Sequence, residues 1–216
     1  MQSIIKPILD TNKLEIITNL KEVFDKAVEA EEDIRKKKFV NGNASLKSSK
    51  IEIEKCMFCN CRCLNSQFEQ TMFSDILFED CDFSNTDFSG CSFTRVSFLN
   101  CKLVGCNFTD AMLYQIYAKG CHARYTNFAA SSLKKVKFYN TILDSANFQA
   151  LHAKKFYFEN CNLISANFFG TSLQQIDFSN SQIEGIVVGI EDVKGMIVNT
   201  MQAIELSKLL GIKIRE

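Results

Sequence analysis

The 216-residue chain lacks several features that would indicate a function directly. It has no Trp and one Pro, and its nine Gly occur singly, so it contains no glycine-rich loop of the kind that holds phosphate. Its 25 basic residues equal its 25 acidic residues, which gives no net attraction to nucleic acid or to an anionic membrane. No apolar run approaches the roughly 20 residues of a membrane span, and the N-terminus has no signal-peptide core. The sequence therefore predicts a cytoplasmic protein.

Residues suited to catalysis are also scarce. The two histidines, His122 and His152, lie 30 residues apart, and neither has a partner at a spacing that suggests acid–base or nucleophilic chemistry. We therefore expect no enzyme activity and no catalytic, cofactor-binding or metal-binding residue.

What the chain does contain is phenylalanine in a fixed frame. From Ile53 to Ile183, the residues at every fifth position are fifteen Phe, six Leu, two Ile, three Ala and one Cys. We call these positions the centres. The residue two before each centre is mostly small or β-branched, and the other three positions are mostly polar. A period of five fits neither a helix nor a strand, so it predicts a repeating architecture.

This pattern resembles the pentapeptide-repeat family, whose motif is A(D/N)LXX. The motif appears as Ala-Asn-Phe-Gln-Ala over residues 146–150 and as Cys-Asp-Phe-Ser-Asn over residues 81–85. The resemblance implies an all-β solenoid, a right-handed quadrilateral β-helix with twenty residues per coil. The centres would then form just under seven coils and a rod of roughly 32 Å, at about 4.8 Å per coil. Centres twenty residues apart would stack, and one such series is Phe68, Phe88, Phe108, Phe128, Phe148 and Phe168.

The sequence predicts three parts: an N-terminal helical segment and hinge (1–49), the β-helix (50–190), and a C-terminal cap and dimerisation helix (191–216). Residues 12–38 have the apolar stripe of an amphipathic helix, with a capping box at Asn12 and Glu15. The basic run 35–38 would close that helix, and residues 41–45 would form the hinge.

The ten cysteines are expected in the core, with the exception of Cys59, which sits at an outward position of the frame. Eight of them occupy the position two before a centre, where Ala, Thr and Val stand elsewhere. Buried Cys behaves as a small apolar residue, so we favour structural cysteines over the zinc site that closely spaced cysteines could also indicate.

After Ile183 the repeat gives way to a short apolar helix. Asn199 or Thr200 can begin it and Gly211 can end it. Residues 202–212 are similar to the tail of the Qnr and MfpA group of pentapeptide-repeat proteins. That resemblance implies a homodimer formed by the C-terminal helix, and binding to DNA gyrase or topoisomerase IV by DNA mimicry, which gives quinolone resistance. The expected dimer residues are Met201, Ile204, Leu206, Leu209, Leu210 and Ile212.

Charge is segregated along the repeat, and we take both charged zones as candidate partner-binding surfaces. Residues 63–94 contain acidic residues and no Lys or Arg, whereas residues 111–157 are mainly basic. Lys134-Lys135 and Lys154-Lys155 are twenty residues apart and should stack. This distribution leaves a general protein-interaction solenoid with an unrelated cytoplasmic partner as the alternative. Direct nucleic-acid binding is not expected, because we predict that the aromatic rings of this zone are buried. The acidic candidates are Glu69, Asp75, Glu79, Asp80, Asp82 and Asp87.

Three centres lack a large side chain: Ala118, Ala123 and Ala153. They could mark local repacking of the core, a bulge in the chain, or a notch that binds a partner.

Overall fold

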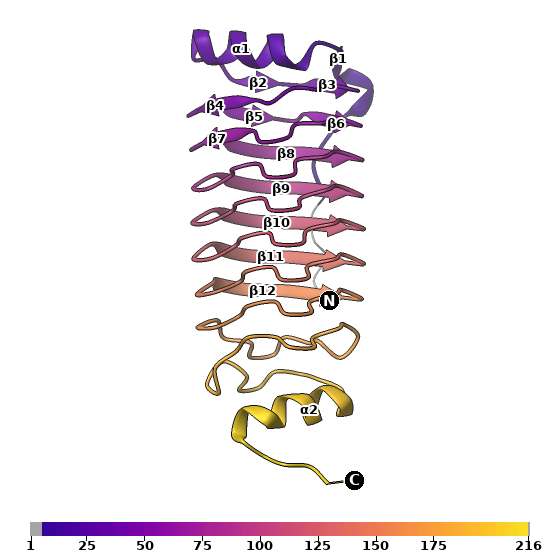
Figure 1. Cartoon of the computed structure of the whole chain (residues 1–216). Helices are drawn as coiled ribbons and strands as arrows, with labels where there is room; N and C mark the ends of the chain where they lie inside the picture. Colours follow the sequence, from indigo (N-terminus) through magenta and orange to yellow (C-terminus); the bar gives the residue numbers. More distant parts are fainter. Residues whose placement is uncertain (1–5, 216) are drawn as a thin grey trace.

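Successive turns of the chain stack along one axis in the computed structural model, which describes residues 6–215. They form a right-handed quadrilateral β-helix of about seven coils with a helix at each end (Figure 1). The predicted fold class is therefore confirmed. No helix in the described residues is long and apolar enough to cross a membrane.

The strands are short where the chain enters the rod and longer in its middle. The N-terminal elements are η1 (Thr11–Lys13), β1 (Glu15–Ile17), α1 (Leu20–Ala30), β2 (Ile34–Arg35), β3 (Lys37–Val40), β4 (Lys47–Ser49), β5 (Glu52–Glu54), β6 (Met57–Cys59) and β7 (Gln67–Glu69). The remaining elements are β8 (Met72–Glu79), β9 (Ser92–Leu99), β10 (Met112–Lys119), β11 (Ser132–Tyr139), β12 (His152–Glu159), α2 (Thr200–Ser207) and η2 (Lys208–Leu210).

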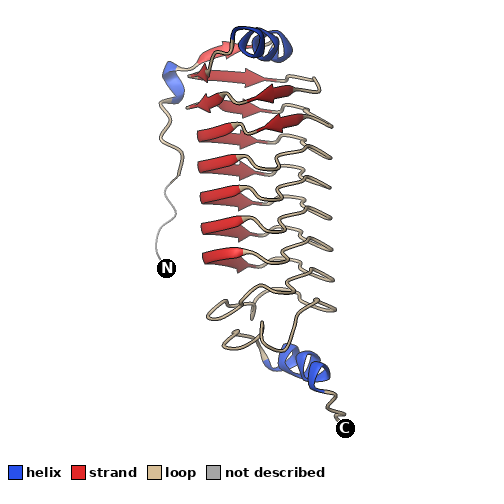
Figure 2. Cartoon of the chain, turned by 90° about the vertical axis from the view of Figure 1, so that its left-hand side faces the viewer, coloured by secondary structure: helices blue, strands red, loops and turns tan. Residues whose placement is uncertain are grey.

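All strand pairs are parallel, and the register shows twenty residues per coil. Met72 pairs with Ser92, Ser92 with Met112, Met112 with Ser132, and Ser132 with His152. Strands β8 to β12 therefore stack in sequence order as one sheet (Figures 1 and 2). Each of these strands spans two sides of the square coil, with a corner residue in its middle. Residues twenty apart form columns that run along the rod.

The corners depend on a left-handed backbone two residues after nearly every centre. Asn85, Asn100 and Gly105 have φ values of 58°, 52° and 66°. Glycine and asparagine tolerate this conformation best, which explains why the sequence favours them there. Arg95 and Tyr125 also adopt it, with φ values of 52° and 58°.

The predicted phenylalanine columns fill the axis of the rod. In the series from Phe68 to Phe168, successive ring centroids lie 5.1, 4.9, 5.1, 5.0 and 4.8 Å apart, and the rings are nearly parallel. Phe88 is fully buried. These side chains therefore build the core and are not available to a partner.

On one side of the coil, the residues before the stacked centres form a polar ladder that includes Asp87, Asn107, Asn127 and Asn147. Asn147 Nδ2 donates to Asn127 Oδ1 at 3.1 Å, and Asn107 Nδ2 donates to Asp87 Oδ1 at 3.1 Å. The same oxygens accept backbone N–H groups two residues further along, as Asn127 Oδ1 does from Ala129 N at 3.1 Å. This double use explains the Asp or Asn of the five-residue motif.

The N-terminal segment differs from its prediction. The predicted bounds of the N-terminal helix, residues 12–38, are wrong. Helix α1 covers Leu20–Ala30, and Glu31 ends it with a φ of 52°. The cap is Asn19, whose Oδ1 accepts Glu22 N at 3.3 Å, and not Asn12. The basic run 35–38 lies in and between β2 and β3 and does not close the helix.

Residues 34–44 already form part of the first coil. Ile34 pairs with Ile53 and Phe39 with Phe58, a spacing of nineteen, whereas Ser48 pairs with Phe68 at the usual twenty. The repeat therefore begins before residue 50, but one missing residue shifts its frame. The predicted domain boundary at residue 49 stays a prediction, although β2, β3 and β4 pair with strands beyond it.

Helix α1 covers the N-terminal end of the rod (Figure 2). Its buried residues are Leu20, Phe24 and Ala27. The ring of Phe24 lies 5.8 Å from that of Phe39 and 6.3 Å from that of Phe68. The helix thus closes the aromatic core, which would otherwise end in contact with water.

At the other end, α2 begins where the sequence predicts. Asn199 and Gln202 form a capping box, and Gly211 ends η2 with a φ of 70°. Gln202 is buried, and its Nε2 donates to Phe178 O at 3.0 Å and to Ser181 O at 2.6 Å. Asn199 Nδ2 also donates to Ser179 O at 2.9 Å, so two amide side chains join the helix to the last coils.

Candidate partner-binding surfaces

The acidic candidates do not gather on one side of the rod. Three of them hold the structure together: Asp82 Oδ1 accepts Ser84 N at 3.0 Å, and Asp87 belongs to the polar ladder. The third is Asp75, at the corner of β8. Glu69 and Asp80 are exposed, whereas Glu79 is half-buried.

Asp75 forms the most buried ion pair of the rod. Its Oδ1 and Oδ2 each lie 2.7 Å from the Arg95 guanidinium, and its Oδ1 also accepts Ile8 N at 2.9 Å. Burial alone would raise the pKa of the Asp75 carboxyl, but these donors outweigh it and hold the pKa below its usual value. Asp75 thus joins two coils and the N-terminal segment, and it is not open to a partner.

The basic candidates do come together. Lys134 pairs in register with Lys154, as predicted, and Lys135 and Lys155 occupy the neighbouring corner. Lys134 and Lys154 are exposed on the outside of β11 and β12.

Sequence analysis missed the tyrosines beside these lysines. Tyr114, Tyr117, Tyr139 and Tyr157 lie on β10, β11 and β12 and are half-buried, with their side chains on the outer surface. None of them occupies a centre, and the sequence pattern predicts only that outward positions are mostly polar. We call the outward residues of β10, β11 and β12 the lysine–tyrosine surface.

The C-terminal helix exposes most of the residues predicted for a dimer. Met201 is 73% exposed and Leu210 64% exposed, and Ile204, Leu209 and Ile212 are also exposed. Leu206 differs, because it is partly buried against the protein's own last coils. A row of apolar side chains therefore faces solvent beyond the end of the rod.

The cysteines are free and, apart from half-buried Cys59, buried. Burial raises the pKa of Cys56 to about 11 and that of Cys91 and Cys106 to about 12, so these thiols are protonated at neutral pH. The structural prediction for them is confirmed. Among residues 6–215, no group of three or more His, Cys, Asp or Glu side chains could hold a metal ion.

The two histidines lie in different columns. His122 pairs with Lys102 and Ile142, whereas His152 pairs with Ser132. The arrangement does not bring them together.

The three centres that are alanine do not disturb the pairing between coils where the structure records it. Ala118 pairs in register with Phe98 and Phe138, so the chain has no bulge there. Ala118 and Ala123 are buried, while Ala153 is half-buried and packs against the core, and nearby Phe156 is buried. The arrangement favours repacking over a notch.

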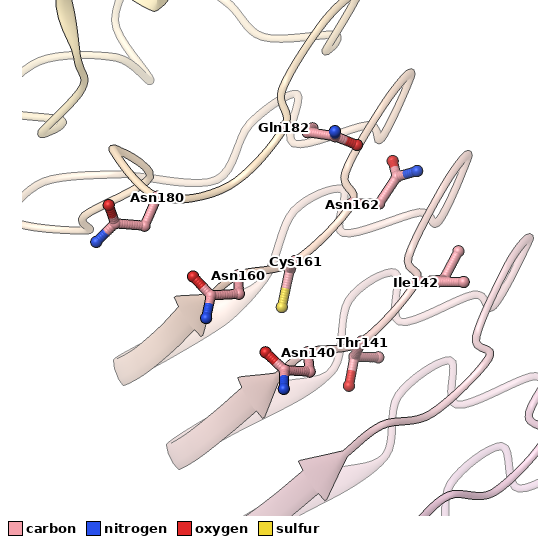
Figure 3. Close-up of a pocket in the computed structure, with 8 residues that line it drawn as sticks. All are labelled: Asn140, Thr141, Ile142, Asn160, Cys161, Asn162, Asn180 and Gln182. Atoms are coloured by element: carbon pink, nitrogen blue, oxygen red, sulfur yellow. The ribbon is translucent and has the colours of Figure 1, made fainter.

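The rod also has a shallow pocket near its C-terminal end, with a volume of about 410 Å³. Figure 3 shows Asn140, Asn160 and Asn180 along one corner of it, with Cys161 between the columns. Burial raises the pKa of the Cys161 thiol, so this pocket offers amide groups and no reactive nucleophile.

Comparison with known proteins agrees with this repeat architecture. Residues 91–168 match a family profile described as a pentapeptide repeat region, and residues 68–112 match one described as pentapeptide repeats (9 copies). Together these matches identify residues 68–168 as a pentapeptide-repeat region.

Among solved structures, its fold resembles that of QnrB1, described as a plasmid-mediated fluoroquinolone resistance protein. A trypsin-treated QnrB1 variant superposes with a TM-score of 0.53 at 19% identity, over 83% of this chain and 90% of that chain. Full-length QnrB1 gives 0.51 at 18% identity, over 92% of this chain and 95% of that chain. At these identities the likeness is one of fold. A search of curated proteins gave no match.

Proposed function

We propose that this protein is a non-enzymatic cytoplasmic scaffold that dimerises through its C-terminal helix and binds a type II DNA topoisomerase along its rod. The observation that carries the proposal is a repeat rod that shares its fold with QnrB1 over most of both chains. Because its core is filled by stacked rings, any partner must bind the outside of the rod or its ends.

The dimer part of the proposal is supported by the apolar residues beyond the last coil. Met201, Leu210 and Ile212 are exposed on or after a helix that Gln202 fixes to the rod. Exposed apolar side chains that gather on one element commonly mark an interface.

The topoisomerase part is tested with purified gyrase in a supercoiling assay, with and without a quinolone. We expect the protein at micromolar dimer concentration to inhibit supercoiling or to protect gyrase from the drug. Absence of both effects would refute this partner.

If the rod imitates DNA, two neighbouring carboxylates that have not been assigned a structural role should contribute to binding. The double variant Glu79→Gln with Asp80→Asn should weaken the effect on gyrase, because these side chains would stand for phosphates. The matched control is Asp110→Asn with Glu184→Gln, which removes the same charge elsewhere and should leave the effect unchanged. Equal effects of both variants would argue against mimicry at these two residues.

A scaffold with an unrelated cytoplasmic partner is the second candidate. It is favoured by the use of Asp75, Asp82 and Asp87 in structural hydrogen bonds, which leaves fewer acidic groups to imitate DNA.

A further inference from the structure

We propose that the lysine–tyrosine surface binds single-stranded nucleic acid. This inference does not depend on topoisomerase binding, and the experiment below contains no topoisomerase. It reverses the expectation from sequence, which rested on aromatic rings being buried in this zone.

The composition of the surface differs from that of the rest of the sheet. Strands β10, β11 and β12 contain six of the chain's lysines, four of its five tyrosines and one acidic residue, Glu159. Strand β8, two coils away, contains Asp75 and Glu79 and no Lys or Arg. The chain's zero net charge therefore hides a basic region on one part of the rod.

Register places the lysines and tyrosines in alternation. Along one column Tyr117 pairs with Lys137, which pairs with Tyr157. Along the next column Lys119 pairs with Tyr139. Since neighbouring strands lie about 4.8 Å apart, each ring has an ammonium group in the adjacent coil.

Contacts within the surface show this alternation directly. Lys134 Nζ lies 5.3 Å from the centre of the Tyr114 ring, and Lys137 Nζ lies 5.4 Å from that of Tyr139. Burial raises the pKa of the Tyr117 hydroxyl, so this side chain is neutral at physiological pH. The rings therefore add flat, uncharged area between the cations.

Three of the lysines have no counter-ion in the part of the chain that the structure describes. No carboxylate among residues 6–215 lies within 4.0 Å of the ammonium group of Lys119, Lys134 or Lys154. Lys137 is different, because its Nζ lies 2.5 Å from Glu159 Oε2. The unneutralised cations mark where an anionic ligand would be attracted.

Alternating cations and rings suit a single strand better than other anions. Phosphates can contact the ammonium groups while unpaired bases stack on the tyrosine rings, and such stacking is tolerant of sequence. The bases of a duplex are paired and stacked on each other, so a duplex could use the lysines alone. An acidic peptide would likewise use the cations and has no planar groups for the rings.

The test measures binding of a fluorescent oligothymidylate of about 15 nucleotides, a length within the range of known single-strand sites. The competitors are a duplex of equal length and an acidic peptide. We expect the single strand to bind most tightly, and its affinity to fall steeply as salt rises from about 50 to 200 mM.

Two double variants separate the contributions of charge and stacking. Lys134→Gln with Lys154→Gln should weaken binding about ten-fold and lower the salt slope by roughly 1.4, or about 0.7 for each lost phosphate contact. Tyr117→Leu with Tyr157→Leu should weaken binding at least about five-fold with an unchanged salt slope, because base stacking is lost.

Matched controls lie on other sides of the rod. Lys47→Gln with Lys102→Gln removes two exposed lysines, and Tyr125→Leu removes the fifth tyrosine, so both should bind as the unaltered protein does. If the tyrosine variant fails to fold, the lysine variant and its control still decide the question. Absence of binding, tighter binding of the duplex or the peptide, or equal losses in controls and variants would overturn the proposal.

Discussion

Individual phenylalanine side chains stabilise the rod through contacts with the coils on both sides. Phe88 is fully buried, and its ring centroid lies 5.1 Å from that of Phe68 and 4.9 Å from that of Phe108. Truncating such a residue removes apolar area and leaves a cavity, because close-packed neighbours relax only in part.

We predict that Phe88→Ala lowers the free energy of unfolding by about 3–5 kcal/mol. Phe169→Ala is the control, since Phe169 is 55% exposed and should cost less than about 0.5 kcal/mol. Denaturant unfolding monitored by circular dichroism measures both. A Phe88 variant as stable as the control would contradict this account of the core.

The Asp75–Arg95 ion pair makes the stability of the rod depend on pH. The pKa of the Asp75 carboxyl is lower in the folded protein than in the unfolded chain. The ionised carboxylate therefore contributes to the free energy of unfolding above the unfolded pKa of about 3.9, and this contribution is lost as pH falls through the folded pKa. Because the carboxylate is almost fully buried, its removal leaves donors without an acceptor.

Asp75→Asn should therefore cost about 2 kcal/mol at neutral pH. The difference from the unaltered protein should begin to shrink below about pH 4, where the carboxyl of the unfolded chain becomes protonated, and should vanish once pH has fallen through the lower pKa of the folded protein. Asp110→Asn, at a corner without such a pair, serves as the control. Thermal unfolding across pH measures the difference, and a cost that does not change with pH would rule out the ionic explanation.

At the scale of elements, the two helices close opposite ends of the rod by different means. Helix α1 inserts Phe24 against the aromatic core. Helix α2 buries one polar side chain, Gln202, which supplies hydrogen bonds to carbonyl groups of the last coils. Asn199 Nδ2 adds a hydrogen bond to Ser179 O, and Leu206 is partly buried against the core, so the C-terminal attachment depends mainly on two amide side chains.

We predict that Gln202→Ala detaches α2 without unfolding the β-helix, because the capping box and two bonds to the rod are lost together. Amide hydrogen exchange should become faster over residues 200–207 and remain unchanged in β8 to β12. Gln149→Ala, an exposed substitution, should change neither region. Slow exchange of α2 in the Gln202 variant would show that other contacts hold it.

The repeat elements could be predicted because the frame from Ile53 to Ile183 never shifts. The first coil could not, since the one-residue shift between β3 and β4 takes Ile34 and Phe39 out of that frame. A polar, helix-forming context then made residues 34–38 resemble the end of a helix. Asn19 and Glu22 offer the same capping pattern as Asn12 and Glu15, and local sequence does not decide between them.

The surfaces were less predictable than the core. The stacking of Lys134 on Lys154 follows directly from a period of twenty. The structural roles of Asp75, Asp82 and Asp87 were not predicted, because sequence does not distinguish a carboxylate that accepts structural hydrogen bonds from one that is free. The tyrosines could be recognised as part of a surface only from the register of β10, β11 and β12, which places them beside the lysines.

At the scale of the whole molecule, the proposed dimer would extend the rod beyond one chain. Replacing Met201 and Leu210 by Glu should yield a monomer, because the new charges would lie in an apolar interface. Met72→Glu, at an exposed residue on the side of the rod, is the control. Sedimentation equilibrium measures the mass, and a double variant that remains dimeric would place the interface elsewhere.

The twenty-residue register also governs which changes of length the molecule can accept. Duplicating one whole coil, such as residues 81–100, would keep every column aligned and lengthen the rod by about 4.8 Å. Inserting five residues instead would turn everything downstream by a quarter of a revolution, so that lysines now in one column would point along another side. The rod can therefore grow by whole coils without a change in its surface pattern. A single added five-residue repeat would instead turn the surface downstream of the insertion relative to the surface upstream of it, with little disturbance to the core.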